Sequence, residues 1–349
     1  MGRLWIFVFL FGCEPTFSDI DQIKPVDTAD PSIGSGDSSE ETVEPSEEVS
    51  EDLDGDGYSV EDGDCDDSNA QVNPEAEEIP GDGLDQDCNG LDGFDLDGDG
   101  FVALEEGGED CDDEDWAISP TALEICDAKD NNCNTQINEG LDCTVYAHSS
   151  SMLYKINPFT FESEEVTSVP GLFDFDTDLE GNLYGISPVS LYLYDTNSQS
   201  WNLIGALGHS GGTLNGFAIS NSGHGFATAG SNLYRVDLTS GQATLVGTMD
   251  SGFVSSGDCV TDKEDNLYMT SGTNGLDTLI RINGETAEAF AVGDTGFADI
   301  WGLTFAWGTL YGFTGSGELL EINPVTGSSE LLHQFSGLSF YGAASSEQR

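Results

Sequence analysis

Basic residues are scarce in this sequence. Only 8 Lys and Arg stand against 66 Asp and Glu among 349 residues, so the formal net charge is −58. Contacts to nucleic-acid phosphates need clustered Lys and Arg, and the composition therefore argues against a nucleic-acid-binding protein. Cations and basic partners are the natural counterparts of such a charge.

Long apolar runs and catalytic motifs are also lacking. Outside the N-terminus no segment is apolar enough to cross a membrane, and hydrophobic residues make up 37% of the chain. The sequence contains no GxSxG, HExxH or phosphate-binding loop, and its four His are scattered. We therefore expect no enzyme. An extracellular hydrolase or lyase is the alternative, and its polar cluster would be Asp174, Asp176 and Asp299.

The first 13 residues have the pattern of an export signal. One Arg precedes the apolar run 4–11, which is too short to span a bilayer as a helix. The stretch LFGC resembles a bacterial lipobox, whose cysteine is lipidated. This resemblance implies an exported lipoprotein, anchored through Cys13 to the outer membrane or cell surface. An ordinary signal peptide with an incidental Cys is the alternative.

Acidic residues are concentrated in the first part of the chain. Residues 1–143 hold 43 Asp and Glu against 3 Lys and Arg, whereas residues 144–349 hold 23 against 5. Segment 14–50 has few large apolar residues, so it cannot bury enough surface to offset its ordering entropy. We predict a disordered acidic linker at 14–50, duplicated repeats at 51–143 and a separate domain at 144–349.

The duplication in residues 51–143 is visible in the order of its motifs. DLDGDG begins at Asp52 and again at Asp95, and each copy continues with DCDD, a Pro nine residues after the Cys, Glu-Ile and a second Cys. Few apolar residues are available for a core. Metal ions and disulfides are therefore expected to hold these units together.

The first acidic turn of each copy has the pattern of a calcium loop. Calcium takes six to eight oxygen ligands, and a DxDxDG loop supplies alternate carboxylates and a carbonyl at position seven. In the second copy the predicted ligands are Asp95, Asp97, Asp99, the carbonyl of Phe101 and a bidentate Glu106. In the first copy Gly63 takes the twelfth position, and the predicted ligands are Asp52, Asp54, Asp56, the carbonyl of Tyr58 and either Asp62 or Asp64.

A second acidic turn follows in each copy. It offers Asp85, Asp87 and Asn89 in the first copy and Asp130, Asn132 and Asn134 in the second. The DCDD stretches could add ligands or bind the backbone of a turn. The alternative for all these segments is a set of solvated acidic turns that bind no ion.

The duplicated unit resembles the MopE-type metal-binding repeat. That family is named for a copper-associated outer-membrane protein and occurs in secreted and surface proteins of bacteria. The resemblance covers roughly residues 51–143 and implies metal binding. Copper sites favour His, Met and thiolate, and this region contains no His and no Met. Calcium is therefore the expected metal, and a copper-associated surface protein is the alternative.

Six of the eight cysteines lie in the repeats, where an exported protein forms disulfides. Sequence alone leaves fifteen pairings of six cysteines. The repeat symmetry predicts Cys65–Cys88 and Cys111–Cys133 as equivalent bonds, with Cys126–Cys143 as an additional pair. A zinc site is the alternative. Cys259 is expected to be a buried free thiol.

Residues 144–349 contain a second repeat. LYKIN at Leu153 recurs as LYLYD, LYRVD, LIRIN and LLEIN at spacings of 38, 42, 46 and 40 residues. Four short strands recurring about every forty residues predict a mainly β fold with a five-bladed β-propeller. The first blade lacks its first strand, which segment 338–345 can supply. The expected partner of the propeller is an extracellular protein or glycan.

Several Asp residues precede the second strands of these blades. Asp174, Asp176 and Asp178 would share one face of a strand. Together with Asp258, Asp262 and Asp299 they could line a channel. Capping of the following turns is the interpretation that we favour.

Overall fold

The computed structural model describes residues 51–79, 82–90, 93, 95–249, 252–272 and 275–345. The predicted signal segment with Cys13 and the linker at 14–50 lie outside these residues. Within the described ranges, no helix has the length and apolar character needed to cross a membrane.

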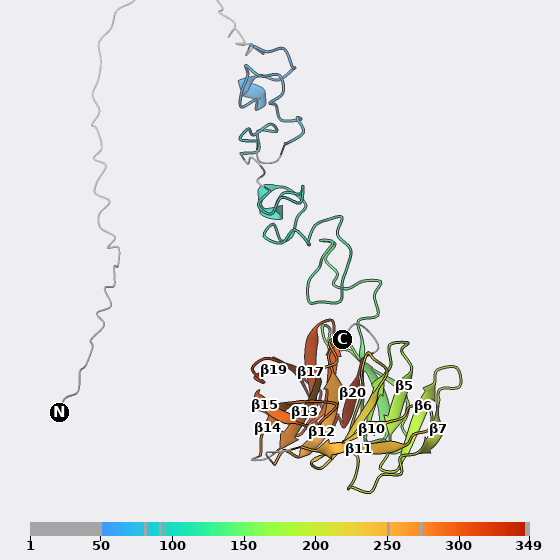
Figure 1. The fold of residues 1–349 in the computed structure, drawn as a ribbon. Coiled ribbons are helices and arrows are strands. Elements are labelled where there is room, and N and C mark those ends of the chain that lie inside the picture. Colours follow the sequence, from blue (N-terminus) through green and yellow to red (C-terminus); the bar gives the residue numbers. More distant parts are fainter. Residues whose placement is uncertain are drawn as a thin grey trace, which may run out of the picture. The chain divides into compact units, whose positions relative to one another are not determined.

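Residues 145–344 form a five-bladed β-propeller of antiparallel four-stranded sheets (Figure 1). Blade 1 consists of β20 (Gly342–Ala344), β1 (Val145–His148), β2 (Met152–Ile156) and β3 (Ser163–Ser168). Blade 2 consists of β4 (Asp174–Thr177), β5 (Leu183–Ile186), β6 (Ser190–Asp195) and β7 (Ser200–Ala206). Blade 3 consists of β8 (Gly216–Ile219), β9 (Gly225–Ala229), β10 (Asn232–Val236) and β11 (Ala243–Thr248). Blade 4 consists of β12 (Ser255–Thr261), β13 (Leu267–Gly272), β14 (Asp277–Ile282) and β15 (Ala289–Asp294). Blade 5 consists of β16 (Ile300–Ala306), β17 (Thr309–Thr314), β18 (Glu318–Ile322) and β19 (Ser329–Gln334).

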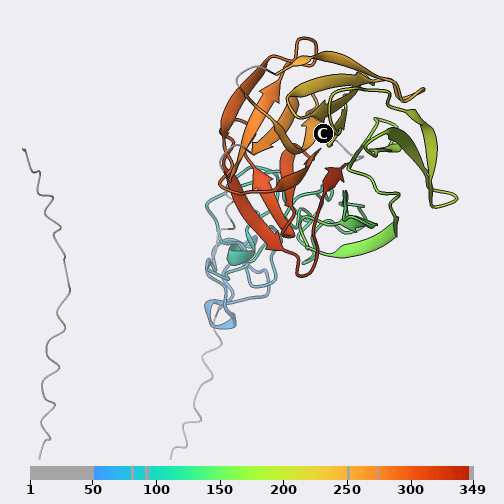
Figure 2. The ribbon, with the colours of Figure 1, turned by 90° about the horizontal axis from the view of Figure 1, so that it is seen from below.

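The ring closes through its last strand, as the sequence predicts. β20 pairs with β1, with Tyr146 opposite Ala344 and His148 opposite Gly342. The innermost strands β20, β4, β8, β12 and β16 are neighbours around a common axis, and Figure 2 views the blades along it. This closure removes the exposed sheet edges that an open array would leave at its two ends.

The five-residue motif that recurs as LYKIN, LYLYD, LYRVD, LIRIN and LLEIN marks the same feature in every blade. The pairing of third and fourth strands shifts register after its Leu, for example between Leu153 and Tyr154 in blade 1. The side chain of the Asn or Asp that ends the motif then accepts hydrogen bonds from the backbone N–H groups of the second and third residues after it. Asn157 Oδ1 accepts the amides of Phe159 and Thr160 at 2.9 and 3.0 Å. A bulge and a side-chain-capped turn therefore recur together.

The propeller core lies between neighbouring blades. Five apolar clusters fill these positions within the described residues. Between blades 5 and 1, for example, Phe313 and Phe340 meet edge to face at 5.2 Å. Cys259 is buried in the cluster between blades 3 and 4 and is free, as expected.

Buried Asp side chains tie the innermost strands together. Asp174 accepts the amide of Phe217 at 2.5 Å, and Asp176 accepts that of Ile219 at 2.7 Å. Asp258 accepts the amide of Leu303 at 2.6 Å. The capping interpretation is wrong for these three residues, because their carboxylates bridge adjacent blades.

Turn capping does hold for two of the other Asp residues. Asp178 accepts the amide of Asn182 at 2.8 Å, and Asp262 accepts that of Asn266 at 2.8 Å. Asp299 is exposed. The six residues therefore do not form one polar cluster.

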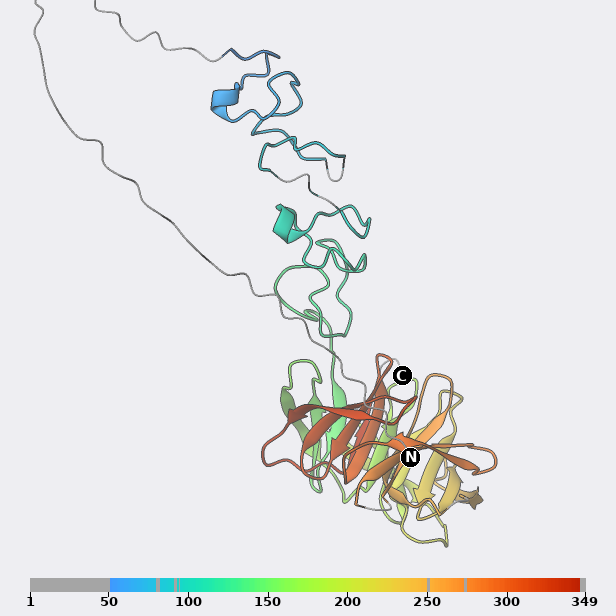
Figure 3. The ribbon, with the colours of Figure 1, turned by 90° about the vertical axis from the view of Figure 1, so that its left-hand side faces the viewer.

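The repeats, by contrast, consist of loops with one short 3₁₀ helix in each copy (Figure 3). These are η1 (Val60–Asp62) and η2 (Leu104–Glu106). Among the described residues of 51–143, the buried apolar side chains are Val72, Val102, Ile118 and the disulfide-bonded Cys143. The small core agrees with the expectation that other interactions hold these units.

Candidate metal centre

The DLDGDG turn of the second repeat is folded by its own carboxylates. Asp95 accepts the amides of Gly98 and Gly100 at 2.6 and 2.9 Å. Asp97 accepts the amide of Asp99 at 3.0 Å. Gly98 and Gly100 have φ of 81° and 100°, a region that favours glycine. The turn brings carboxylate oxygens of the three Asp residues within 4.8 Å of one another.

Two further carboxylates join this turn from the DCDD stretch. Oxygens of Asp97, Asp110 and Asp113 also lie within 4.8 Å of one another, so Asp97 belongs to both groups. The amide of Asp110 donates to Val102 O at 2.9 Å, and its carbonyl accepts from Leu104 N at 2.7 Å. The chain therefore folds back after η2 and places Asp110 beside the turn.

Three carboxylate oxygens at this place are buried without a hydrogen-bond partner. They belong to Asp97, Asp99 and Asp110. Burial, followed by the charges of neighbouring Asp residues, raises the pKa of Asp97 and of Asp110. Buried oxygens of this kind are costly unless a partner satisfies them, and a cation is the partner that suits converging carboxylates.

Glu106 belongs to neither carboxylate group. It ends η2, and Gly107 follows with φ of 85°, which turns the chain back toward Asp110. A calcium loop of the predicted type leads into a long helix that carries the twelfth residue inward. Here the 3₁₀ helix has only three residues, and Asp110 adds a carboxylate beside the turn. The predicted role of Glu106 as a ligand stays a prediction.

The first repeat has the same construction. Oxygens of Asp52, Asp54 and Asp56 lie within 4.8 Å of one another. Asp54 and Asp64 each have a buried oxygen without a partner. Burial raises the pKa of Asp54, and the charge of Asp64 is among the neighbouring charges that add to this shift.

Two details distinguish the first site. Asp62 accepts the hydroxyl of Ser59 at 2.6 Å, so it caps η1, and Asp64 is the closing candidate with an unsatisfied oxygen. Asp56 accepts a hydrogen bond from the side-chain Nδ2 of Asn73 at 2.9 Å, whereas the equivalent Asp99 has a buried oxygen without a partner. The second repeat therefore offers more unsatisfied oxygens to an ion.

The seventh-position residues contribute through their backbone. Tyr58 N donates to Asp56 at 2.9 Å, and Phe101 N donates to Asp99 at 3.0 Å. The predicted role of their carbonyls as ligands stays a prediction.

The later turn of the first repeat forms a second carboxylate group. Oxygens of Glu78, Asp85 and Asp87 lie within 4.8 Å of one another, and Glu78 and Asp85 each have a buried oxygen without a partner. Asn89 Nδ2 donates to Asp87 at 3.0 Å. Glu78 was not predicted from the sequence. The shared Glu-Ile dipeptide of the two copies is the signal that could have indicated it.

The later turn of the second repeat is less acidic. Asp130 accepts the amide of Asn134 at 3.1 Å, and Glu139 accepts the side-chain amide of Asn132 at 2.6 Å. One oxygen of Asn132 and one of Glu139 are buried without a partner. Thr135 adopts φ of 73°, where the first repeat has Gly90 at 91°.

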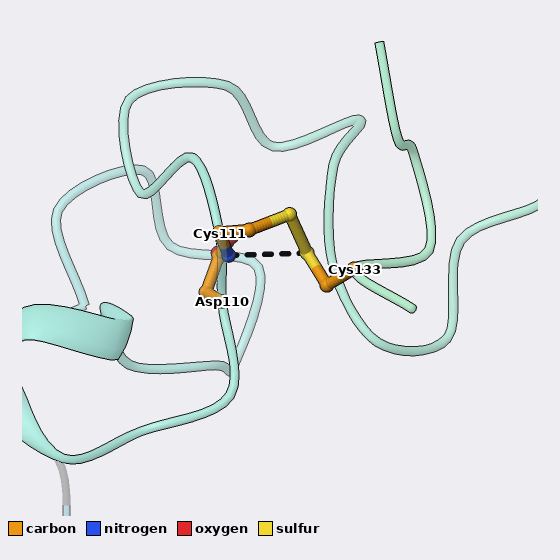
Figure 4. Close-up of side chains that lie close together, drawn as sticks. All are labelled: Asp110, Cys111 and Cys133. Atoms are coloured by element: carbon orange, nitrogen blue, oxygen red, sulfur yellow. Dashed lines mark hydrogen bonds between the residues drawn. A yellow bond between two sulfur atoms is a disulfide. The ribbon is translucent and has the colours of Figure 1, made fainter. Parts of the chain in front are cut away.

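In each copy a disulfide connects the DCDD stretch to the later acidic turn. The structure pairs Cys65 with Cys88 and Cys111 with Cys133, and it adds Cys126–Cys143, which is the pairing that the repeat symmetry predicts. Cys111 lies next to Asp110, and its amide donates to Cys133 Sγ at 3.1 Å (Figure 4). Sulfurs bonded to each other are not thiolate ligands, so the zinc alternative fails.

Within the part of the chain that the structure describes, no ion pair neutralises these carboxylate groups. Lys129, the single basic residue of 51–143 in the sequence, pairs with Asp115 at 2.6 Å and with Asp112 at 3.6 Å. It lowers the pKa of Asp115, chiefly through its hydrogen bond. Neither of these partners is a member of the carboxylate groups described above.

A comparison with known protein families agrees with the repeat region of the chain. Residues 64–92 and 110–139 match a copper-binding MopE family model described as "Putative metal-binding motif". The chain thus carries this metal-binding motif in two copies, followed by a five-bladed propeller. No curated protein matches the chain.

The similar solved structures have low sequence identity. One is a structural genomics protein of unknown function from Bacteroides thetaiotaomicron, with 14% identity and a TM-score of 0.45; the match covers 60% of this chain and 63% of that one. Another is a chain of the nidogen/laminin complex, with 14% identity, a TM-score of 0.43 and coverage of 58% and 98%. TolB from Acinetobacter baumannii has 15% identity and a TM-score of 0.39, with coverage of 55% and 53%.

Proposed function

We propose that this chain is an exported surface protein whose repeats bind calcium and whose propeller recognises an extracellular protein or glycan. The observation that carries the calcium assignment is the set of unsatisfied buried oxygens of Asp97, Asp99 and Asp110. Every ligand that this site offers is a hard oxygen, which suits calcium or magnesium. Calcium tolerates irregular carboxylate sets, whereas magnesium demands near-ideal octahedral geometry and keeps several waters.

Copper is disfavoured by the same ligand set. The described part of 51–143 offers neither imidazole nor thioether, and all six of its cysteines are in disulfides. The disulfides also support export, because such bonds persist in oxidising compartments. Within this proposal Cys13 carries a lipid anchor to the outer membrane or cell surface, and segment 14–50 is the linker.

Calcium would act in the repeats by replacing the repulsion between neighbouring carboxylates with the attraction of each carboxylate to the ion. Without a cation, the carboxylates of Asp95, Asp97, Asp99, Asp110 and Asp113 repel one another across short distances. An ion bound between them links the DLDGDG turn to the DCDD stretch. Calcium therefore stiffens each repeat, and the disulfides extend this effect to the later turn.

Calorimetric titration of the full, oxidised chain tests this proposal. We expect saturable calcium binding with Kd of about 10⁻⁴–10⁻³ M, the range of extracellular calcium modules, and weaker binding of magnesium. Asp110→Asn keeps the side-chain shape and removes the charge, and it should weaken the second-repeat site at least ~10-fold. Glu114→Gln removes an equal charge at an exposed position outside the carboxylate groups and should bind like the wild type.

Two results would overturn the calcium assignment. One is the lack of saturable binding up to several millimolar, well beyond the range of extracellular modules. The other is equal affinity of the Asp110→Asn and Glu114→Gln variants, because bulk charge would then explain the binding. Copper that survives chelation on the wild type would favour the copper-associated alternative.

A further inference from the structure

The five innermost strands of the propeller begin around one pocket. Its lining comes from every blade: Phe173, Asn215, Ser256, Gly257, Trp301 and Tyr341. Each residue lies at or just before the start of β4, β8, β12, β16 or β20. We name these six residues the axial pocket; its volume is about 240 Å³. A site to which all five blades contribute exists only because the ring is closed.

Aromatic side chains form most of the wall of the axial pocket. The rings of Trp301 and Tyr341 stack at 5.2 Å with an interplanar angle of 29°. Phe173 and Tyr341 remain 41% and 38% exposed. Gly257 leaves room beside Trp301, because a Cβ at this position would lie 2.5 Å from Trp301 Cα. Exposed aromatic faces gathered at one pocket are a common property of ligand sites.

Two polar groups in the wall, the Oδ1 of Asn215 and the Oγ of Ser256, have no hydrogen-bond partner in the protein. The side-chain amide of Asn215 donates from Nδ2 to Ser255 O at 3.4 Å, which orients it. Its Oδ1 is buried and accepts no hydrogen bond. A buried acceptor of this kind indicates a ligand that carries a donor or a positive charge.

The charge around the axial pocket favours a positively charged ligand. None of its six residues is charged. Directly after Phe173, however, Asp174 begins a buried set that also includes Asp176 and Asp258, and a single proton held between Asp174 and Asp258 still leaves one carboxylate charge in that pair. Residues 144–349 carry 23 Asp and Glu against 5 Lys and Arg. Negative potential repels anions and attracts cations, and aromatic faces bind cations through their quadrupole.

A neutral sugar fits this wall less well. Sugar hydroxyls need several polar partners, whereas the axial pocket offers two unsatisfied side-chain groups, Asn215 Oδ1 and Ser256 Oγ, and mainly aromatic surface. We propose that the axial pocket binds the ammonium group of an organic cation. The group is carried by a choline-type molecule or by a lysine side chain of a partner. This inference rests on the recognition role proposed for the propeller and names its ligand class.

The chain enters β1 at the end of the propeller axis opposite the axial pocket. β1 runs antiparallel to β20, with Tyr146 opposite Ala344 and His148 opposite Gly342. The chain therefore enters β1 at the end of the axis where β20 finishes. Tyr341 stands at the opposite end, just before β20 starts.

Titration of the full, calcium-loaded chain with choline tests the proposal, with 3,3-dimethylbutan-1-ol as the uncharged isostere. We expect saturable choline binding, with the isostere at least ~10-fold weaker, and quenching of tryptophan fluorescence through Trp301. Tyr341→Leu should weaken choline binding ~10-fold or more. Phe290→Leu changes an aromatic residue that is 55% exposed on β15 and should have no effect. A lysine amide probe separates the sources: tighter binding than choline indicates a protein partner, and weaker binding a quaternary ammonium.

Equal binding of choline and its isostere would overturn the proposal, because the axial pocket would then be merely apolar. Tyr341-dependent binding of a neutral pyranose without choline binding would also overturn it, while leaving the recognition role intact. Calcium titration of the same samples keeps the tests separate. A Tyr341→Leu chain with unchanged calcium binding and circular dichroism is folded, and Trp301→Phe serves as a second variant if it is not.

Discussion

Raising the pH should weaken the propeller through the buried pair Asp174–Asp258. The charge of Asp258 acts on the carboxyl group of Asp174, and both side chains are fully buried. Burial raises the pKa of Asp258 to about 8, and burial with the Asp258 charge raises the pKa of Asp174 well above its ordinary value. The folded pair therefore holds a proton at neutral pH. This proton gives Asp258 Oδ1 the partner that it otherwise lacks.

The sign of the effect follows from proton linkage. The unfolded chain loses this proton near pH 4 and the folded chain near pH 8, so between them the unfolding free energy falls as pH rises. His148 has the opposite effect below about pH 6.5. Burial lowers its pKa to about 4, so its contribution makes the unfolding free energy rise with pH in that range. Above about pH 6.5 the opposing effect of His148 is complete, and the pair contributes about 1.4 kcal/mol per pH unit, or roughly 2 kcal/mol up to pH 8.

Asp258→Asn isolates this contribution. The amide keeps an acceptor for the Leu303 amide and cannot titrate. Urea unfolding of the oxidised chain with a metal chelator, followed by tryptophan fluorescence, gives the unfolding free energies. From about pH 6.5 to 8 the difference between wild type and variant should fall by roughly 2 kcal/mol, since the repeat carboxylates contribute equally to both proteins. Asp299→Asn, at an exposed position, should follow the wild type. Parallel profiles for wild type and Asp258→Asn would refute the shared proton.

Three variants of the repeats give further predictions. Replacing Cys126 and Cys143 by Ser opens a loop of 17 residues and should lower the unfolding free energy of the metal-free second repeat by about 3 kcal/mol, measured by proteolysis; unchanged protease resistance would contradict this. Gly108→Ala places a Cβ 2.1 Å from Val102 O, so it should displace the DCDD stretch and weaken calcium binding in calorimetry; wild-type affinity would count against the carboxylate site described here. Thr135→Gly relieves a left-handed backbone and should stabilise the later turn by about 1 kcal/mol in urea unfolding, whereas destabilisation would show that the Thr side chain matters more than its φ.

The propeller could be predicted because its repeat is local. The Leu of each five-residue motif (LYKIN and its four counterparts) precedes a register shift. The last residue of the motif caps the next turn, so one short segment encodes two features of every blade. Segment 338–345 could be identified for the same reason, since β20 completes a pattern that blade 1 lacks. The Cys pairs followed from the symmetry of two copies.

The metal centre could be predicted only in part, because some of its residues arrive through the tertiary fold. Asp95, Asp97 and Asp99 are gathered by a local turn, which the sequence shows. Asp110 joins them because η2 ends after three residues and the chain reverses. Glu78 approaches Asp85 through a similar return of the chain. The bridging role of Asp174 depends on which strand lies beside β4, and no local pattern contains that information.

Ring closure by β20 also has a kinetic consequence. β1 can pair with β20 only after the chain of all four other blades has been synthesised, because His148 pairs with Gly342. Pairing over such a sequence separation is slow, and an unpaired strand edge is a template for association with other chains. Until β20 arrives, the axial pocket also lacks Tyr341, so the ligand site and the closed ring form in the same step. A ligand that binds there would therefore hold the ring shut and slow its opening.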